Sequence, residues 1–216
     1  MNKGNLNMDD AIFDFAFSMA LGDAIRRVAE DSDKDLGKDN VKNEVKKYAD
    51  TIIKGSKGVN FDSTVNTIQK FNQDFTFGKI QKLINMTMKY LYIKYYDNSE
   101  VRERYSQCDA PLDSLMRDFV YKSYYYFTTD NNRKPNNVKA IFDPECSWSK
   151  IGKPDYKRDD YDNYQEAIKK LIEIAKDKGL LINNRIEFDY LFWGEAKKLR
   201  DKNTTIDKIW ENVLKT

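Results

Sequence analysis

Apolar residues recur every three or four positions along most of this 216-residue chain, which is the spacing of one face of an α-helix. The clearest case is the stripe formed by Ile80, Leu83, Ile84, Met88 and Leu91. Only 9 glycines and 4 prolines interrupt the chain, too few for the many turns of an all-β fold. The sequence therefore predicts an all-α fold. We expect a single compact multi-helix domain over residues 1–216, with two lobes and a cleft between them as the open alternative.

Capping residues and polar breaks set the expected helix bounds. Asp9 or Asp10 should cap the first helix and Asp62 or Ser63 the third, and Pro111 suits a first helical turn. The expected helices cover residues 10–28, 41–53, 63–71, 78–95, 111–124, 160–178, 184–200 and 204–214. Residues 97–109 should form a polar break, and residues 130–159 an irregular region of the kind that often carries function.

Two aromatic-rich stretches are expected to be buried. The first helix is apolar on much of its circumference, with Phe15 and Met19 among its apolar residues. Four aromatic residues should pin the penultimate helix to the core: Phe188, Tyr190, Phe192 and Trp193.

The composition excludes several kinds of site. The chain has no histidine, which removes histidine-dependent triads and most catalytic zinc sites. Two cysteines, Cys108 and Cys146, are too few for a disulfide framework or for a cysteine-only zinc site. We therefore expect no metal ion and no cofactor.

Charge and hydropathy bear on partners and compartment. The net charge of +2 is not that of a tight nonspecific nucleic-acid binder. Net charge averages over the whole surface, so it does not exclude binding through a local basic face. No apolar run approaches the roughly 20 residues that span a bilayer. Residues 1–10 lack the basic start and apolar core of a secretory signal. These features predict a cytoplasmic protein that does not bind membranes.

One group of residues near the middle of the chain is a candidate catalytic site. Lys82 and Asn85 follow Gly78 at the start of an apolar helix, and Asp113 and Ser114 stand at the start of the next. An amine and a carboxylate in one pocket can attack a sugar C1′ and stabilise the positive charge that develops there. In the competing interpretation both residues have only local roles. Lys82 lies on a solvated helix face, and the negative charge of Asp113 interacts favourably with a helix dipole.

Residues 75–119 resemble the helix-hairpin-helix DNA glycosylase superfamily, and in particular its lysine-bearing, oxoguanine-glycosylase-like members. That family carries a glycine-containing hairpin, then a helix with a Lys-x-x-Asn motif, then an aspartate at a helix start. The matching residues are Gly78, Lys82, Asn85, Asp113 and Ser114. The interval between lysine and aspartate is longer here than in the family, which implies an insertion over residues 96–109.

The resemblance implies an enzyme that flips a modified base out of double-stranded DNA and excises it. Asp113 would stabilise the sugar cation, and a neutral Lys82 would attack C1′ and form a Schiff base that permits strand cleavage. With Lys82 charged, water would be the nucleophile and Asp113 its base. The implied role is base-excision repair of an oxidised purine or, in a phage-restricting relative, antiviral removal of bulky modified bases. The expected partner is DNA carrying such a base, bound by a monomer.

The same resemblance assigns further contacts. Backbone N–H groups at the start of a helix can hold a phosphate, and a flipped base needs aromatic faces and amide edges to read it. The expected DNA-binding residues are Gly78, Lys79, Asn85, Lys89 and Ser114. The expected base pocket comprises Phe77, Gln81, Trp148, Lys150 and Tyr164.

Two other functions stay open. The basic face of Lys79, Lys82 and Lys89 could bind phosphates in a non-catalytic nucleic-acid or partner-protein module of a defence or mobile-element locus. Such a module needs no carboxylate beside its lysines. In a purely structural helical protein, Lys82 and Asp113 would lie far apart.

Overall fold

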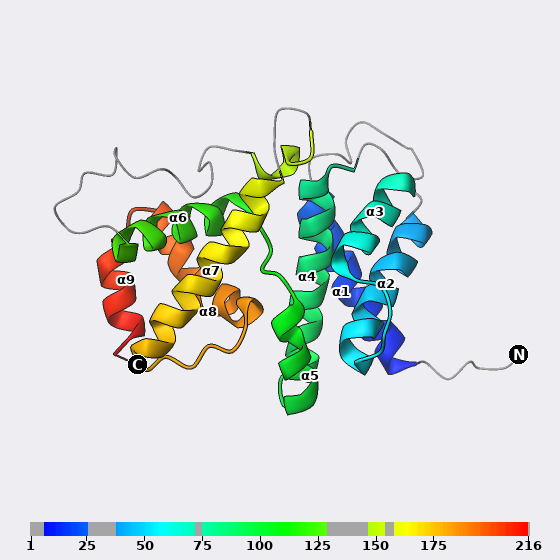
Figure 1. The fold of residues 1–216 in the computed structure, drawn as a ribbon, viewed down its shortest axis with the longest axis horizontal. Helices are drawn as coiled ribbons and strands as arrows, with labels where there is room; N and C mark the ends of the chain where they lie inside the picture. The colour runs from blue at the N-terminus through cyan, green and yellow to red at the C-terminus, as the bar shows by residue number, and fades with distance from the viewer. Residues whose placement is uncertain (1–6, 26–37, 72–74, 129–146, 154–157, 216) are drawn as a thin grey trace, which may run out of the picture. The chain divides into compact units, whose positions relative to one another are not determined.

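The computed structural model describes residues 7–25, 38–71, 75–128, 147–153 and 158–215. Within these ranges the chain forms helices and no β-strand, so the all-α prediction is confirmed (Figure 1). The chain divides into two compact units, Met1–Gln107 and Cys108–Thr216. No helix of the described residues is long and apolar enough to cross a membrane.

The helices follow the predicted order. The first unit contains α1 (Met8–Ile25), α2 (Lys38–Lys54), α3 (Phe61–Phe71), α4 (Phe77–Tyr95), α5 (Ser99–Arg104) and the 3₁₀ turn η1 (Tyr105–Gln107). The second contains α6 (Ser114–Thr128), the 3₁₀ turn η3 (Trp148–Lys150), α7 (Asp159–Asp177), α8 (Arg185–Arg200) and α9 (Ile206–Val213). Apart from η3, most of the predicted irregular region lies outside the described residues.

Helix α4 forms the centre of the first unit. Ile80, Leu83, Ile84 and Met88 have no exposed surface, which is the stripe that the apolar spacing predicted. Helix α1 packs along α4, and α2, α3 and α5 also contact it (Figure 1). Each fully buried side chain of this size contributes about 1.5–3 kcal/mol, so the stripe is a major source of stability for this unit.

Helix α1 buries only one face. Phe13, Ala16 and Phe17 are buried, whereas Phe15 is 64% exposed and Met19 is 45% exposed. The prediction that this helix is buried on most of its circumference is therefore wrong for Phe15 and Met19. The buried residues follow helical spacing, and the two exposed side chains lie outside that stripe.

The junction between α2 and α3 relies on two local signals. Gly55 has a φ of 64°, a left-handed conformation that ends α2 at low steric cost. Asn60 caps α3, because its Oδ1 accepts a hydrogen bond from the Ser63 N–H at 2.8 Å. Ser63 returns the bond through its Oγ, which accepts the Asn60 N–H at 3.0 Å. The prediction that Asp62 or Ser63 caps this helix is therefore wrong, since Ser63 is the partner of the cap.

Arg104, from α5, caps the C-terminal end of α2. Its Nε donates to the Ile52 carbonyl at 2.9 Å and its Nη2 donates to the Ile53 carbonyl at 2.6 Å. Carbonyls in the last helical turn lack partners within the helix, so Arg104 supplies donors that the helix cannot. We expect Arg104→Ala to lower the free energy of unfolding in urea by about 2 kcal/mol. Arg102→Ala, which removes a guanidinium lying over the Tyr96 ring, should cost about 0.5–1 kcal/mol. Equal losses in the two variants would contradict the capping role.

The predicted polar break over residues 97–109 is wrong. Residues 99–104 form α5 and residues 105–107 form η1, with Val101 and Tyr105 buried.

The expectation that Pro111 occupies the first turn of the next helix is also wrong. Helix α6 begins at Ser114, because the Asp113 side chain caps it and a helix starts after its cap.

The second unit is built on an aromatic core. Helix α6 contacts α7, α8 and α9. The Phe119 and Phe192 ring centroids lie 5.1 Å apart, and those of Phe192 and Trp210 lie 4.6 Å apart. The Trp210 indole donates to the Ser123 hydroxyl at 3.0 Å, which satisfies its buried N–H group.

Helix α8 buries two of the four aromatic residues that were expected to pin it. Phe188 and Phe192 are completely buried, as predicted. Tyr190 is 37% exposed and Trp193 is 44% exposed, so the prediction is wrong for these two. Residues four apart share a helix face, and the face that carries Phe188 and Phe192 excludes the other two.

Candidate functional site

Helix α4 begins directly after Thr76, whose hydroxyl accepts a hydrogen bond from the Lys79 N–H at 3.3 Å. Gly78 is the second residue of this helix, where the family resemblance expects a hairpin glycine. Gly78 therefore belongs to the helix and not to a hairpin turn. Residues 72–74, which precede this start, lie outside the described residues. The first-turn N–H groups of a helix have no helical acceptor, but Gly78 is buried, so its backbone has little surface for the phosphate contact that was predicted for it.

A ladder of buried polar side chains runs along one face of α4. Gln81 and Asn85 have no exposed surface, and Lys89 is 8% exposed. The Gln81 Nε2 donates to the Gly78 carbonyl at 2.9 Å, and the Asn85 Nδ2 donates to the Gln81 Oε1 at 3.3 Å. Without exposed surface, Gln81 cannot read a base and Asn85 cannot reach a phosphate in this arrangement. Phe77, also predicted for the base pocket, is buried as well.

Two lysines of α4 reach solvent near its start. Lys79 and Lys82 are partly exposed, in contrast to the buried Lys89. They occupy the first and second turns of the helix, where cations can meet a phosphate approaching the N-terminal end. Lys79 and Lys82 are therefore exposed enough to contact a substrate, whereas the side chain of Lys89 has too little exposed surface for such a contact.

Asp113 caps helix α6. Its Oδ1 accepts hydrogen bonds from the Leu115 N–H and the Met116 N–H, both at 2.9 Å. The Oδ2 atom receives no hydrogen bond from the residues that the structure describes, and the side chain is partly exposed. The local interpretation of Asp113 as a helix-start residue is confirmed. That role occupies one oxygen and leaves the other for a ligand. Ser114, the first residue of α6, is exposed.

The segment that leads to Asp113 is fixed by side chains from two other helices of its unit. Gln165 of α7 accepts the Ala110 N–H through Oε1 at 3.0 Å and donates from Nε2 to the Ala110 carbonyl at 2.7 Å. The Tyr164 hydroxyl donates to the Pro111 carbonyl at 3.2 Å. The Arg185 Nε donates to the carbonyl of Cys108, a buried residue, at 3.0 Å. We call residues 108–113 the Asp113 segment.

A partly buried ion pair anchors the start of the Asp113 segment. The Arg185 Nη2 lies 2.8 Å from the Asp109 Oδ1, and the Tyr161 hydroxyl donates to the Asp109 Oδ2 at 2.7 Å. Burial raises the pKa of Asp109 above its usual value, while the Arg185 charge and the Tyr161 hydrogen bond act to lower it. The pair is therefore a structural contact in which the carboxylate depends on its two partners.

Tyr164 was predicted to line a base pocket, and the structure gives it another role. It has no exposed surface, so it cannot stack on a base in this arrangement. Burial, followed by the negative charges of Asp189 and Asp113, raises the pKa of Tyr164 well above its usual value. The hydroxyl therefore stays protonated and donates to the Pro111 carbonyl. The remaining base-pocket candidates, Trp148 and Lys150, lie in η3, where Trp148 is partly exposed and Lys150 exposed.

The predicted site residues are divided between the two units. The six residues on α4 and Phe77 at its start belong to the first unit, and Asp113, Ser114, Trp148, Lys150 and Tyr164 belong to the second. The structure brings Asp113 into the electrostatic range of Tyr164. The meeting of Lys82 and Asp113 at one sugar stays a prediction.

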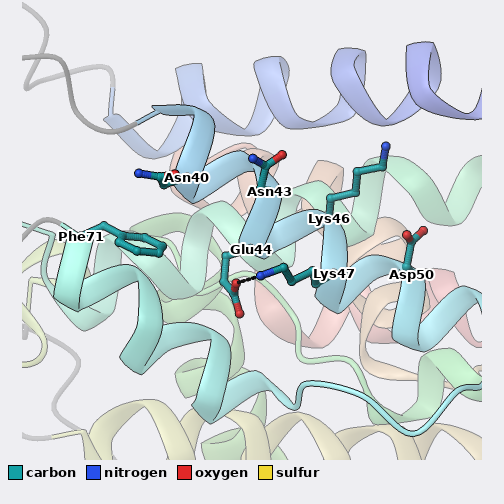
Figure 2. Close-up of a pocket in the computed structure, with 7 residues that line it drawn as sticks. All are labelled: Asn40, Asn43, Glu44, Lys46, Lys47, Asp50 and Phe71. Carbon is teal, nitrogen blue, oxygen red and sulfur yellow. Dashed lines mark hydrogen bonds and ion pairs between the residues drawn. The ribbon is translucent and has the colours of Figure 1, made fainter.

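The first unit also carries a polar hollow away from the predicted residues. Figure 2 shows that α2 supplies most of its lining and that Phe71, at the end of α3, supplies the rest. Its charges are paired: Lys47 with Glu44 at 2.9 Å, Lys46 with Asp10, and Asp50 with Lys54 at 3.2 Å. No predicted site residue lines this hollow, and its paired charges make it a salt-bridged surface rather than a candidate site.

Of the residues that fix the Asp113 segment, Gln165 and Arg185 were missed from the sequence, and Tyr164 was assigned another role. Gln165 carried a detectable signal, since a glutamine at this position interrupts the apolar stripe of α7 that includes Tyr164, Ile168 and Leu171. A polar residue on a buried stripe predicts a specific buried partner. Its partner Ala110 lies 55 residues away, so spacing alone could not identify it.

Known proteins give no further guide to this site. No protein-family model matches the chain, and no curated protein and no solved structure matches it either.

Proposed function

We propose that this protein is a DNA glycosylase that excises a modified base from double-stranded DNA. The observation that supports it best is the state of Asp113. Two backbone N–H groups hold one carboxylate oxygen, the other oxygen takes no hydrogen bond from the described residues, and the side chain is partly exposed. A carboxylate fixed in this way can stabilise developing positive charge without reorganising during the reaction.

The chemistry that the proposal requires is the cleavage of the bond between base and sugar. Positive charge builds at the sugar carbon as that bond breaks, in an oxocarbenium-like transition state. Asp113 stabilises this charge, and the Lys82 amine, or a water molecule, attacks C1′. The partly exposed Lys82 and Lys79 supply the positive charge that a DNA phosphate needs.

An excision assay with covalent trapping tests the proposal. The protein is incubated with duplexes that carry a panel of oxidised purines and bulky phage-type modified bases, with and without borohydride. Release of free base from at least one duplex is the expected result. A borohydride-trapped adduct identifies the amine pathway, because borohydride reduces the Schiff base to a stable bond.

Two substitutions at Lys82 separate nucleophile from phosphate contact. Lys82→Ala and Lys82→Arg should both abolish the trapped adduct, since a guanidinium does not form the Schiff base. Lys82→Arg should retain DNA binding in an anisotropy titration, because it keeps the charge, whereas Lys82→Ala should weaken it. An adduct that survives in Lys82→Arg would remove Lys82 as the nucleophile.

The remaining outcomes are equally decisive. Base release that persists without Lys82 but requires Asp113 indicates a monofunctional enzyme with water as the nucleophile. Absence of release from every duplex, together with DNA binding, contradicts the glycosylase proposal and favours a non-catalytic binding module.

A further inference from the structure

Gln165 makes an unusual contact for a core side chain. It is 4% exposed and lies on the buried face of α7. Its amide pairs with both polar groups of one residue, accepting from the Ala110 N–H at 3.0 Å and donating to the Ala110 carbonyl at 2.7 Å. Two opposed hydrogen bonds to one residue fix the orientation of the Ala110 backbone as well as its distance from α7.

The path from Ala110 to Asp113 is short and stiff. Pro111 locks its own φ angle, and its carbonyl accepts the Tyr164 hydroxyl at 3.2 Å. Leu112 is 2% exposed and so has little room to move. The next residue is Asp113, whose Oδ1 is held by the first turn of α6. A displacement of Ala110 is therefore transmitted to Asp113 instead of being absorbed between them.

We propose that Gln165 is a positioning residue that fixes where the Asp113 carboxylate stands relative to the reacting sugar. This inference rests on the proposed glycosylase function. Gln165 touches no substrate and acts through the backbone of Ala110 and Pro111. Misplacement of a catalytic group by about 1 Å costs about 10²-fold in rate, so a support of this kind has a measurable effect on catalysis.

A purely structural role for Gln165 makes a different prediction. If the amide only satisfied two buried backbone groups, its loss would lower stability and leave the rate of the folded enzyme unchanged. A positioning role requires that the rate fall at temperatures where the variant is fully folded. The two roles therefore separate in single-turnover kinetics of folded protein.

The first test compares Gln165→Leu with Ile172→Val. Gln165→Leu keeps the size of the side chain and removes both hydrogen bonds. Ile172→Val is a matched core change two turns further along α7, at a residue with 7% exposure. With enzyme in saturating excess over the duplex, the excision rate of Gln165→Leu should fall about 10²-fold with its DNA affinity unchanged. Ile172→Val should keep the wild-type rate.

Gln165→Glu supplies a pH-dependent rescue. A protonated glutamic acid offers one donor and one acceptor, as the amide does, whereas the carboxylate faces the Ala110 carbonyl with two acceptors. The charged groups that act on the neighbouring Asp109 and Tyr164 include Asp113, Asp162, Asp189, Lys169 and Arg185, and Tyr161 and Tyr164 are the nearby phenols. The rate of Gln165→Glu relative to wild type should therefore rise as the pH is lowered from about 8 to about 6, since burial favours the protonated acid. Gln165→Leu should show no such rescue.

Amide hydrogen exchange tests the same inference without any activity. The Leu115 and Met116 N–H groups are protected by the Asp113 Oδ1, so they report where that side chain stands. Their exchange should quicken at least tenfold in Gln165→Leu and stay unchanged in Ile172→Val. If the wild-type protein releases no base, the proposed function fails, and unchanged exchange in Gln165→Leu then overturns the positioning role as well. An active wild type with a full-rate Gln165→Leu overturns the positioning role alone.

Discussion

Replacing Asp113 with asparagine should abolish base excision while leaving the fold intact. Asparagine caps helices about as well as aspartate, so its Oδ1 can still accept the Leu115 and Met116 N–H groups. The substitution removes the negative charge and little else. Loss of a single preorganised electrostatic contact to a transition state costs about 10²–10³-fold in rate, and loss of a full charge should cost at least that much. Single-turnover excision kinetics on the best duplex of the panel measure the effect.

Two further substitutions at Asp113 separate charge from capping. Asp113→Ala should lose activity and also about 1 kcal/mol of unfolding free energy, because the first turn of α6 loses its cap. Asp113→Glu keeps the charge but moves it by one methylene group, so it should retain DNA binding and lose most of the rate. If Asp113→Asn excises at the wild-type rate, the carboxylate serves only as a cap, and the proposed role of Asp113 in catalysis is wrong.

The helices with strong apolar periodicity could be predicted from the sequence. The bounds of α4, α7, α8 and α9 match the expected ranges within about two residues, because apolar residues at helical spacing end at polar residues, or, after α7, at Gly179. Helix α5 was missed because it has six residues, of which only Val101 is buried, so no stripe marks it. Phe15, Met19, Tyr190 and Trp193 were wrongly expected to be buried because apolar character does not show which face of a helix meets a neighbour.

The candidate site was predictable in part. Asp113 was placed at a helix start, and Lys82 on a helix face outside the apolar stripe, which local sequence can show. The packing of Gln81, Asn85 and Tyr164 was not predictable, because burial of a polar side chain depends on partners elsewhere in the chain. The contacts that fix the Asp113 segment join residues more than 50 positions apart, beyond the reach of any local pattern.

Arg185→Ala should produce the largest loss of stability in the second unit. The Arg185 and Asp109 side chains are 11% and 17% exposed, and their charged atoms lie 2.8 Å apart. Removal of Arg185 leaves the mostly enclosed Asp109 carboxylate with the Tyr161 hydroxyl but without its cation, which should cost about 3 kcal/mol, the lower end of the range for buried pairs. The substitution also removes the hydrogen bond from Arg185 to the Cys108 carbonyl, so the Asp113 segment loses its first anchor. Urea unfolding measures the change in free energy.

The pH dependence of that loss identifies Asp109 as its source. Burial already raises the pKa of Asp109, and without the Arg185 charge, which acts to lower it, this pKa should rise further. An acid whose pKa is raised by folding destabilises the native state as the pH climbs from its ordinary range through the raised value. The cost of Arg185→Ala should therefore be larger at neutral and alkaline pH and should shrink as the pH falls through the raised pKa of Asp109, because a protonated Asp109 needs no cation.

A double substitution completes the argument. Asp109→Asn removes the partly buried charge, and its amide oxygen can still accept a hydrogen bond from the Tyr161 hydroxyl, as the Asp109 Oδ2 does at 2.7 Å. Arg185→Ala should then cost much less in the Asp109→Asn background than in the wild type, and its pH dependence should disappear, because no charge remains to be compensated. An equal cost in both backgrounds would show that Arg185 stabilises the unit through packing and its bond to Cys108. The excision rate of the double variant then measures how much of the rigidity of the Asp113 segment comes from this anchor and how much from Gln165.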